Sequence, residues 1–171
     1  MPKGIRNLNK KVVFWVLVVG MVAVDQYVKI WCLKNMSPGG SINGMPWPGV
    51  FELRLTLNSG IAFGMLDGFG PVLAPIAVLI AALGGIYVYK HPKEPMWTHV
   101  AMGLLAAGAL GNLIDRVSRH QVVDMFHLKA INFPVFNVAD ICITIAAAML
   151  IIKWSRESKA TSTEIETPQV T

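Results

Sequence analysis

The stretch from Ala130 to Ile152 constrains the fold most, because its 23 residues carry one formal charge, Asp140. A predominantly apolar run of about 20 residues is long enough to cross a bilayer as a helix. A carboxylate at membrane depth costs at least about 2.5–3.5 kcal/mol, so it requires a polar cavity, a partner or a chemical role. A second acid, Asp124, lies sixteen residues upstream in the apolar run Val122–Phe126. Two acids in such settings predict a paired-carboxylate site at a membrane surface.

The composition extends this expectation of a lipid environment to the whole chain. Apolar residues make up 54% of the 171 residues and charged residues only 15%, whereas soluble domains are about 25% charged. Candidate spans run from Val12 to Cys32, from Gly68 to Tyr89 and from Pro95 to Ile114, and a fourth lies within Ala130–Ile152. We therefore predict an all-α membrane fold over residues 1–155, with four transmembrane helices.

The distribution of Lys and Arg indicates the orientation of these spans. The basic residues are concentrated before the first predicted span, in the loop after the second, and directly after the fourth. The excess of basic residues in cytoplasmic segments then predicts that both termini are cytoplasmic. The net charge of +5 is interpreted as anchoring to anionic lipid, and no basic patch with interleaved aromatic residues indicates nucleic-acid binding. The first span resembles a signal peptide, but without a cleavage site we expect an uncleaved anchor.

The connections between the spans carry the predicted β structure. Apolar and polar residues alternate strictly from Phe51 to Asn58, which is the period of a half-buried strand. We expect a small extracytoplasmic sheet within about residues 37–66, with the apolar segment Ile61–Leu66 dipping back toward lipid. The segment from Asp115 to Lys129 is predicted to be an interfacial loop on the same side. Residues 156–171 are rich in Ser, Thr and Glu and predict a disordered cytoplasmic tail.

Polar residues inside the first and third spans form two further candidates. Asp25 and Lys29 stand four residues apart in the favoured order for a helix ion pair, and a structural pair is the favoured interpretation. Asn112, Asp115 and Arg116 lie near one face at the outer end of the third span. They fit either snorkelling and capping at a helix end or a polar network that lines a site, and the pattern leaves both open.

Asp124 and Asp140 are the candidate reactive groups, since neither has Lys or Arg within four positions. Paired carboxyl groups in a low dielectric share a proton, so one acts as a base while the other remains an acid. Such a pair can hydrolyse an amide with water, without a metal or a covalent nucleophile. Proton or ion translocation is the alternative that intramembrane acids also serve. His127, three residues after Asp124, is a weaker hint of a metal site.

Five motifs in this order resemble the lipoprotein signal peptidases, also called signal peptidase II. The similarity covers about Val12 to Ile152. The motifs are Asp25-Gln26-Tyr27-Val28-Lys29, Asn58-Ser59-Gly60-Ile61-Ala62-Phe63, Gly108-Ala109-Leu110-Gly111-Asn112-Leu113-Ile114-Asp115-Arg116, Val122-Val123-Asp124-Met125 and Phe136-Asn137-Val138-Ala139-Asp140. One position departs from the family pattern, because Val28 stands where the family usually has Ser or Thr.

The resemblance implies a function and a set of site residues. It implies an intramembrane aspartic endopeptidase that cleaves the signal peptide of diacylglyceryl-modified prolipoproteins just before the lipidated cysteine. Asp124 and Asp140 match the catalytic pair, and Asp115 looks structural. The positions that match residues supporting the site or binding substrate are Asp25, Lys29, Asn58, Gly111, Asn112, Arg116 and Asn137.

The resemblance also implies a setting for this activity. The expected location is the bacterial inner membrane, with the site near the extracytoplasmic face and the sheet as a cradle for the substrate. The expected partners are the prolipoprotein and membrane lipids, with no metal, organic cofactor or nucleic acid, and a monomer is expected. A proton-coupled membrane carrier subunit remains the alternative function.

Overall fold

The computed structural model describes residues 3–60 and 70–166, and side chains within 9–42, 47–60 and 73–158. The predicted inward segment Ile61–Leu66 lies outside the described residues. The helices are α1 (Lys3–Asn35), α2 (Gly70–Lys90), α3 (Met96–Arg119) and α4 (Val138–Glu166), and the strands are β1 (Ser41–Trp47), β2 (Phe51–Asn58) and β3 (Val122–His127). A short 3-10 helix, η2, spans Lys129–Ile131. Within the described ranges, four helices are long and apolar enough to cross a membrane, which confirms the predicted fold class.

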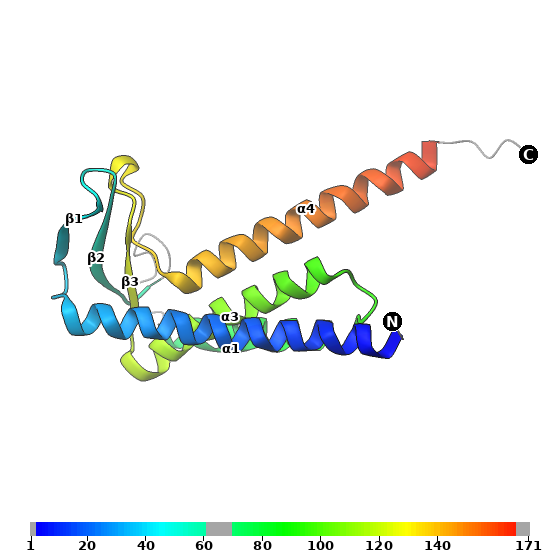
Figure 1. The fold of residues 1–171 in the computed structure, drawn as a ribbon, viewed down its shortest axis with the longest axis horizontal. Helices are drawn as coiled ribbons and strands as arrows, with labels where there is room; N and C mark the ends of the chain where they lie inside the picture. The colour runs from blue at the N-terminus through cyan, green and yellow to red at the C-terminus, as the bar shows by residue number, and fades with distance from the viewer. Residues whose placement is uncertain (1–2, 61–69, 167–171) are drawn as a thin grey trace, which may run out of the picture.

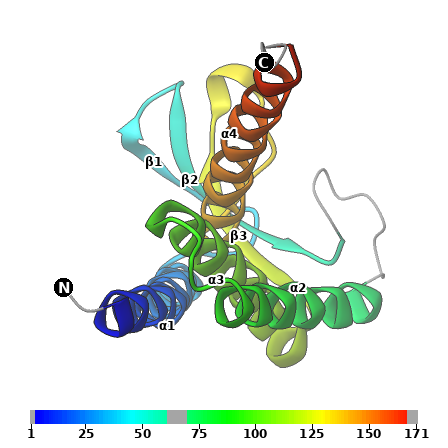
Figure 2. The same cartoon turned by 90° about the vertical axis from the view of Figure 1, so that its right-hand side faces the viewer.

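Helix α3 is the centre of the bundle. It packs against α1, α2 and α4, whereas α1 and α2 touch each other little (Figure 2). The sheet covers one end of the bundle, and the start of α1 and the end of α4 lie at the opposite end (Figure 1). One apolar core joins α1, α2 and α3 through Phe14, Val18, Val88 and Ala106. The sheet and the helix ends that contact it therefore lie together at one end of the bundle, which corresponds to one membrane boundary.

The sheet is antiparallel with the strand order β1-β2-β3. Strand β2 has the bounds that the alternation of Phe51–Asn58 predicts. One face of the sheet packs against the end of α1, where Leu55, Val123 and Met125 form a buried cluster with Cys32. This cluster fixes the sheet to the bundle, so that the opposite face of β3 is directed toward the ends of α3 and α4.

The prediction that Asp115–Lys129 lies on the same side as the sheet is confirmed, but the prediction that this segment is a loop is wrong. Helix α3 continues to Arg119, His120 ends it in the left-handed conformation (φ 61), and residues Val122–His127 form β3. A strand that is buried on both faces lacks the alternation that identifies a half-buried strand. Strand β3 is of this kind, because Val123 and Met125 pack toward α1 while Val122 and Asp124 line a cavity on the other face.

The end of α4 also differs from the expectation of a disordered tail over residues 156–171. The helix continues to Glu166. Arg, Glu, Lys and Ala are good helix formers, and the segment after the fourth span contains Arg156, Glu157, Lys159 and Ala160. A helix that extends an existing span needs no new nucleation, so low apolar content alone does not end it.

Candidate active site

Asp124 and Asp140 line one cavity of about 450 Å³ between β3 and the facing ends of α3 and α4. Asp124 is supplied by β3, and Asp140 by the first turn of α4. The Nδ2 atom of Asn137 donates to Oδ1 of Asp124 at 2.7 Å, and Nδ2 of Asn112 donates to Oδ1 of Asp140 at 2.9 Å. The structure thus brings the two candidate carboxyl groups to one cavity, and each accepts a hydrogen bond from an asparagine side-chain amide.

Asn137 also fixes the start of α4. Its Oδ1 atom accepts a hydrogen bond from the backbone N–H of Asp140 at 2.9 Å, and Oδ2 of Asp140 accepts from the backbone N–H of Asn137 at 3.1 Å. This reciprocal arrangement is a capping box. It holds the Asp140 carboxyl group in one place, at the helix N-terminus, where the helix dipole stabilises negative charge.

The orientation of the Asn112 amide follows from its neighbours. Its Oδ1 atom accepts from Nζ of Lys29 and from Nδ2 of Asn137, both at 3.0 Å. Because Lys29 can only donate, the Asn112 oxygen must face it, and the NH₂ group must face Asp140. Asn112 is 7% exposed, so it belongs to the buried network and does not snorkel to the surface.

A buried group of charges supports this network from α1 and α3. Nζ of Lys29 lies 2.8 Å from Oδ2 of Asp25 and 2.8 Å from Oδ2 of Asp115, and all three side chains are at most 1% exposed. The predicted ion pair between Asp25 and Lys29 is therefore confirmed. Asp115 has a second cation, Arg119, and Oδ1 of Asp25 accepts from the backbone N–H of Ala139 at 2.9 Å. Charges from α1 thus hold the first turn of α4.

Asp124 has the environment of a carboxyl group that keeps its proton near neutral pH. Burial raises the pKa of Asp124 to about 7, and the negative charge of Asp140 adds to the rise. Hydrogen bonds from the amides of Asn58 and Asn137 lower this pKa but do not offset the burial. Nδ2 of Asn58 donates to Oδ2 of Asp124 at 3.1 Å, so both carboxyl oxygens of Asp124 have amide partners.

The remaining predicted site residues take two different positions. Arg116 lines the cavity and donates from Nη2 to the carbonyl oxygen of Gly60 at 3.3 Å. Gly111 lies where a Cβ atom would come within 2.7 Å of Oδ2 of Asp25 and 3.1 Å of Cβ of Ala139. Gly111 therefore allows α1, α3 and α4 to approach closely. Arg116 brings a cation to the border of the cavity.

Sequence reasoning assigned no role to Gln26. Its Nε2 atom donates to Oδ2 of Asp25, to the carbonyl oxygen of Gly111 and to Oδ1 of Asp115, at 3.1–3.2 Å. An amide inside a predicted span, next to an acid, is the signal that marks it, since polar groups at that depth need partners. Gln26 joins the charge group around Lys29 to the backbone of α3.

The cavity has predominantly apolar walls, and a more polar extension runs along the sheet. The wall residues that sequence reasoning missed include Phe133, Pro134, Ile141 and Ile145. A second cavity of about 450 Å³ adjoins the first, shares Asp124, and is bordered by polar groups from β2, β3 and the following loop. The site therefore offers both an apolar and a polar surface to a bound molecule.

His127, which the sequence offered as a weak hint of a metal site, contacts Glu52 in the structure. Nδ1 of His127 lies 3.0 Å from Oε1 of Glu52 on the neighbouring strand. Among the residues whose positions the structure describes, no three His, Cys, Asp or Glu side chains lie close enough to hold an ion. His127 therefore pairs strand β3 with β2.

Comparison with solved structures identifies the class of protein. Two structures described as bacterial membrane enzymes, solved by the in meso method, superpose with TM-scores of 0.79 and 0.73, each at 31% identity. The first superposition covers 91% of this chain and 93% of the solved chain, and the second covers 82% of this chain and 91% of the solved chain. The fold is thus that of a multi-span bacterial membrane enzyme.

Sequence comparison identifies the family. A lipoprotein signal peptidase of Gloeobacter violaceus is 37% identical over 148 residues, covering 86% of this chain and 84% of the relative. One from Streptococcus pneumoniae is 36% identical over 152 residues, covering 88% and 97%. The family model for signal peptidase (SPase) II matches residues 17–156. The chain therefore belongs to the signal peptidase II family of membrane proteases, which confirms the resemblance that its five motifs carry.

Proposed function

We propose that this chain is an aspartic endopeptidase that removes the signal peptide of diacylglyceryl-modified prolipoproteins, cutting just before the lipidated cysteine. The observation that carries the proposal is the pair of carboxyl groups, Asp124 and Asp140, on one cavity at the end of the bundle. The two groups have different surroundings, and pairs of acids in unequal environments are suited to opposite roles in proton transfer.

The surroundings support one division of these roles. Asp140, at the N-terminus of α4, acts as the base: it takes a proton from water while the water oxygen forms a bond to the carbonyl carbon. Asp124, whose pKa is about 7, carries the proton that passes to the leaving nitrogen as the carbon–nitrogen bond breaks. Asn112 and Asn137 hold the two carboxyl groups, while Asn58 and Arg116 orient the substrate backbone. No step of this reaction requires a metal or an organic cofactor.

The position of the site matches a lipid-anchored substrate. Asp140 lies in the first turn of a span that runs from Val138 to Ser158, which is the depth of a membrane boundary. A diacylglyceryl group anchors the scissile bond near the headgroups, so that the apolar walls receive lipid-modified chain and the sheet receives extended peptide. The bias of Lys and Arg supports cytoplasmic termini and a sheet outside the inner membrane, and we take the chain to act as a monomer.

Purified protein and two synthetic peptides test this function. A peptide with diacylglyceryl cysteine should be cut once, before that cysteine, as mass spectrometry of both products will show. The same peptide with unmodified cysteine should be cut at least about tenfold more slowly, and a chelator should leave the rate unchanged. Equal cleavage of both peptides would contradict lipid recognition. Proton flux into liposomes without any cleavage would instead support the carrier.

A further inference from the structure

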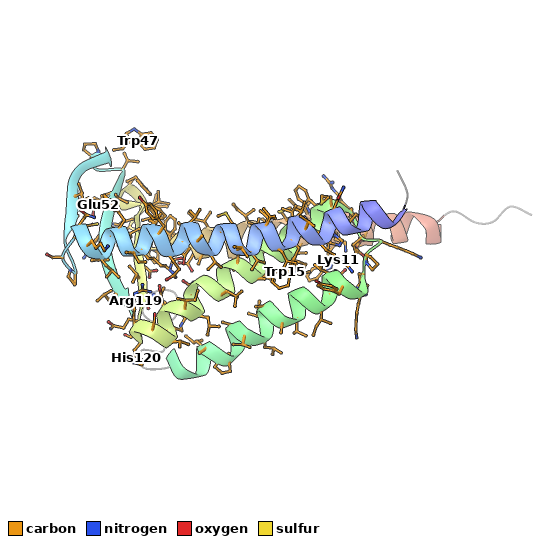
Figure 3. The ribbon with its side chains drawn as sticks, turned by 60° about the horizontal axis from the view of Figure 1, so that its bottom comes forward. Lys11, Trp15, Trp47, Glu52, Arg119 and His120 are labelled. Atoms are coloured by element: carbon orange, nitrogen blue, oxygen red, sulfur yellow. The ribbon has the colours of Figure 1, made fainter. Side chains whose placement is uncertain are left out.

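A groove between α1 and α2 lies at the end of the bundle opposite to the sheet. Its volume is about 800 Å³, and its surface is predominantly apolar. The residues that line it are Lys11, Val12, Trp15, Val16, Val19, Gly20 and Tyr89. Figure 3 shows Lys11 and Trp15 toward the end of α1 that lies away from the sheet. Lys29, which supports the candidate active site, is 18 residues further along α1, or about 27 Å at 1.5 Å per residue.

Polar groups are confined to one end of this groove. Nζ of Lys11 lies 4.5 Å from the centre of the Tyr89 ring, and Nε1 of Trp15 donates to the Tyr89 hydroxyl at 3.2 Å. The ring contact holds the ammonium at the mouth of the groove, and the Tyr89 hydroxyl still has its own O–H to donate. Lys90, exposed in the last turn of α2, adds positive charge next to Tyr89. This end is suited to a negatively charged headgroup.

The length of the groove corresponds to one leaflet. Gly20 is nine positions after Lys11, which is about 13.5 Å along a helix. The hydrocarbon layer of one leaflet is about 15 Å thick, half of the 30 Å bilayer core. A Cβ atom at Gly20 would have no atom within 4 Å, so the absence of a side chain there leaves space at the inner end. This length is that of an acyl chain in one leaflet.

We propose that this groove binds one acyl chain of an anionic phospholipid, with Lys11 contacting the phosphate. The site belongs to the leaflet at the N-terminal end of α1 and is separate from the candidate active site. Trp15 and Tyr89 hold the glycerol region, since both residues favour the membrane–water interface. Val12, Val16 and Val19 provide the surface along which the chain lies.

Native mass spectrometry of the full chain, released from nanodiscs of equal parts phosphatidylglycerol and phosphatidylethanolamine, tests the proposal. The protein should retain one phosphatidylglycerol in preference to phosphatidylethanolamine. Lys11→Gln should lower that preference about fivefold, the usual effect of one basic residue near an anionic surface. Lys34→Gln, an exposed lysine at the other end of α1, is the matched control and should change nothing.

Two substitutions separate a groove from a surface charge. Gly20→Leu should fill the inner end and lower retention of both lipids at least fivefold, and Val16→Trp should do the same from an exposed wall position. Gly85→Leu, on α2 outside the groove and with no atom within 4 Å of its Cβ position, should not. Unchanged retention in a folded Gly20→Leu or Val16→Trp variant would overturn the proposal, as would equal retention of both lipids by the unsubstituted chain. A dimer that dissociates on Gly20→Leu would assign the groove to a second copy and would also overturn it.

Discussion

Replacement of Lys29 should destabilise the fold, because its ammonium contacts three buried groups. Nζ lies 2.8 Å from Asp25, 2.8 Å from Asp115 and 3.0 Å from Oδ1 of Asn112. Replacement by Met keeps the length of the side chain and removes the charge. Asp115 then retains Arg119, but Asp25 loses the cation that contacts it within the described part of the chain.

The expected size of the effect follows from this loss. Removing one partner of a buried ion pair costs about 3–5 kcal/mol, because the other charge stays buried without compensation. For a chain of this size, 1 kcal/mol corresponds to about 2–4 °C in melting temperature. Lys29→Met should therefore lower the melting temperature by roughly 6–20 °C. Tryptophan fluorescence during heating in detergent measures this.

Two further variants decide whether the uncompensated charge is the cause. Lys34→Met, on the same helix but exposed, should shift the melting temperature by no more than about 2 °C, as expected of a surface substitution. The double variant Asp25→Asn, Lys29→Met removes the uncompensated charge and should be more stable than Lys29→Met alone. A Lys29→Met protein as stable as Lys34→Met would refute the reasoning, and so would a double variant less stable than the single one.

Three other predictions follow from the site. Because folding raises the pKa of Asp124 from 3.8 to about 7, the fold favours its neutral form, and stability should fall by up to about 4 kcal/mol between pH 4 and pH 7 and level off above; chemical denaturation of Asp124→Asn should lack this component. Gly111→Ala would bring a Cβ within 2.7 Å of Oδ2 of Asp25 and should lower the melting temperature by several degrees, whereas Gly85→Ala, with open space at that position, should not; equal melting temperatures would contradict the close approach. Asn137→Ala removes a helix cap worth about 1 kcal/mol and the hydrogen bonds that its NH₂ group donates to Asp124 and Asn112, so kcat should fall more than about tenfold; an unchanged kcat would show that Asn137 does not position the pair.

The local patterns of the sequence predicted those parts of the molecule that depend on near neighbours. Strict alternation over Phe51–Asn58 predicts the bounds of β2, and Leu55 on its apolar face is buried against the end of α1. The spacing of Asp25 and Lys29 gave their ion pair, because residues four apart share a helix face. In both cases the pattern that predicts the structure can be recognised within the segment itself.

Contacts between distant segments were not accessible in this way. The sequence of β3 predicts a loop, because burial on both faces removes the alternation of a half-buried strand, and the strand is defined by its pairing with β2. The contact between Lys29 and Asp115 joins two helices, and Asn112 meets Asp140 only when α3 and α4 pack. The environment of Asp124 and Asp140 did suggest that they act together, because an acid in an apolar setting needs a partner or a role.

The rate of cleavage by Asp124→Asn and Asp140→Asn proteins tests the central claim most directly. Each carboxamide keeps the shape of the side chain. In the Asp140→Asn protein the one remaining oxygen can accept from the backbone N–H of Asn137, while the hydrogen bond from Asn112 is lost. With the diacylglyceryl peptide as substrate, we predict that each substitution lowers kcat by at least about 10²-fold, the usual contribution of a general acid or base, while the melting temperature does not fall below that of the unsubstituted chain by more than about 3 °C. A folded variant of either kind that retains more than a tenth of the original kcat would contradict a reaction carried out by this pair.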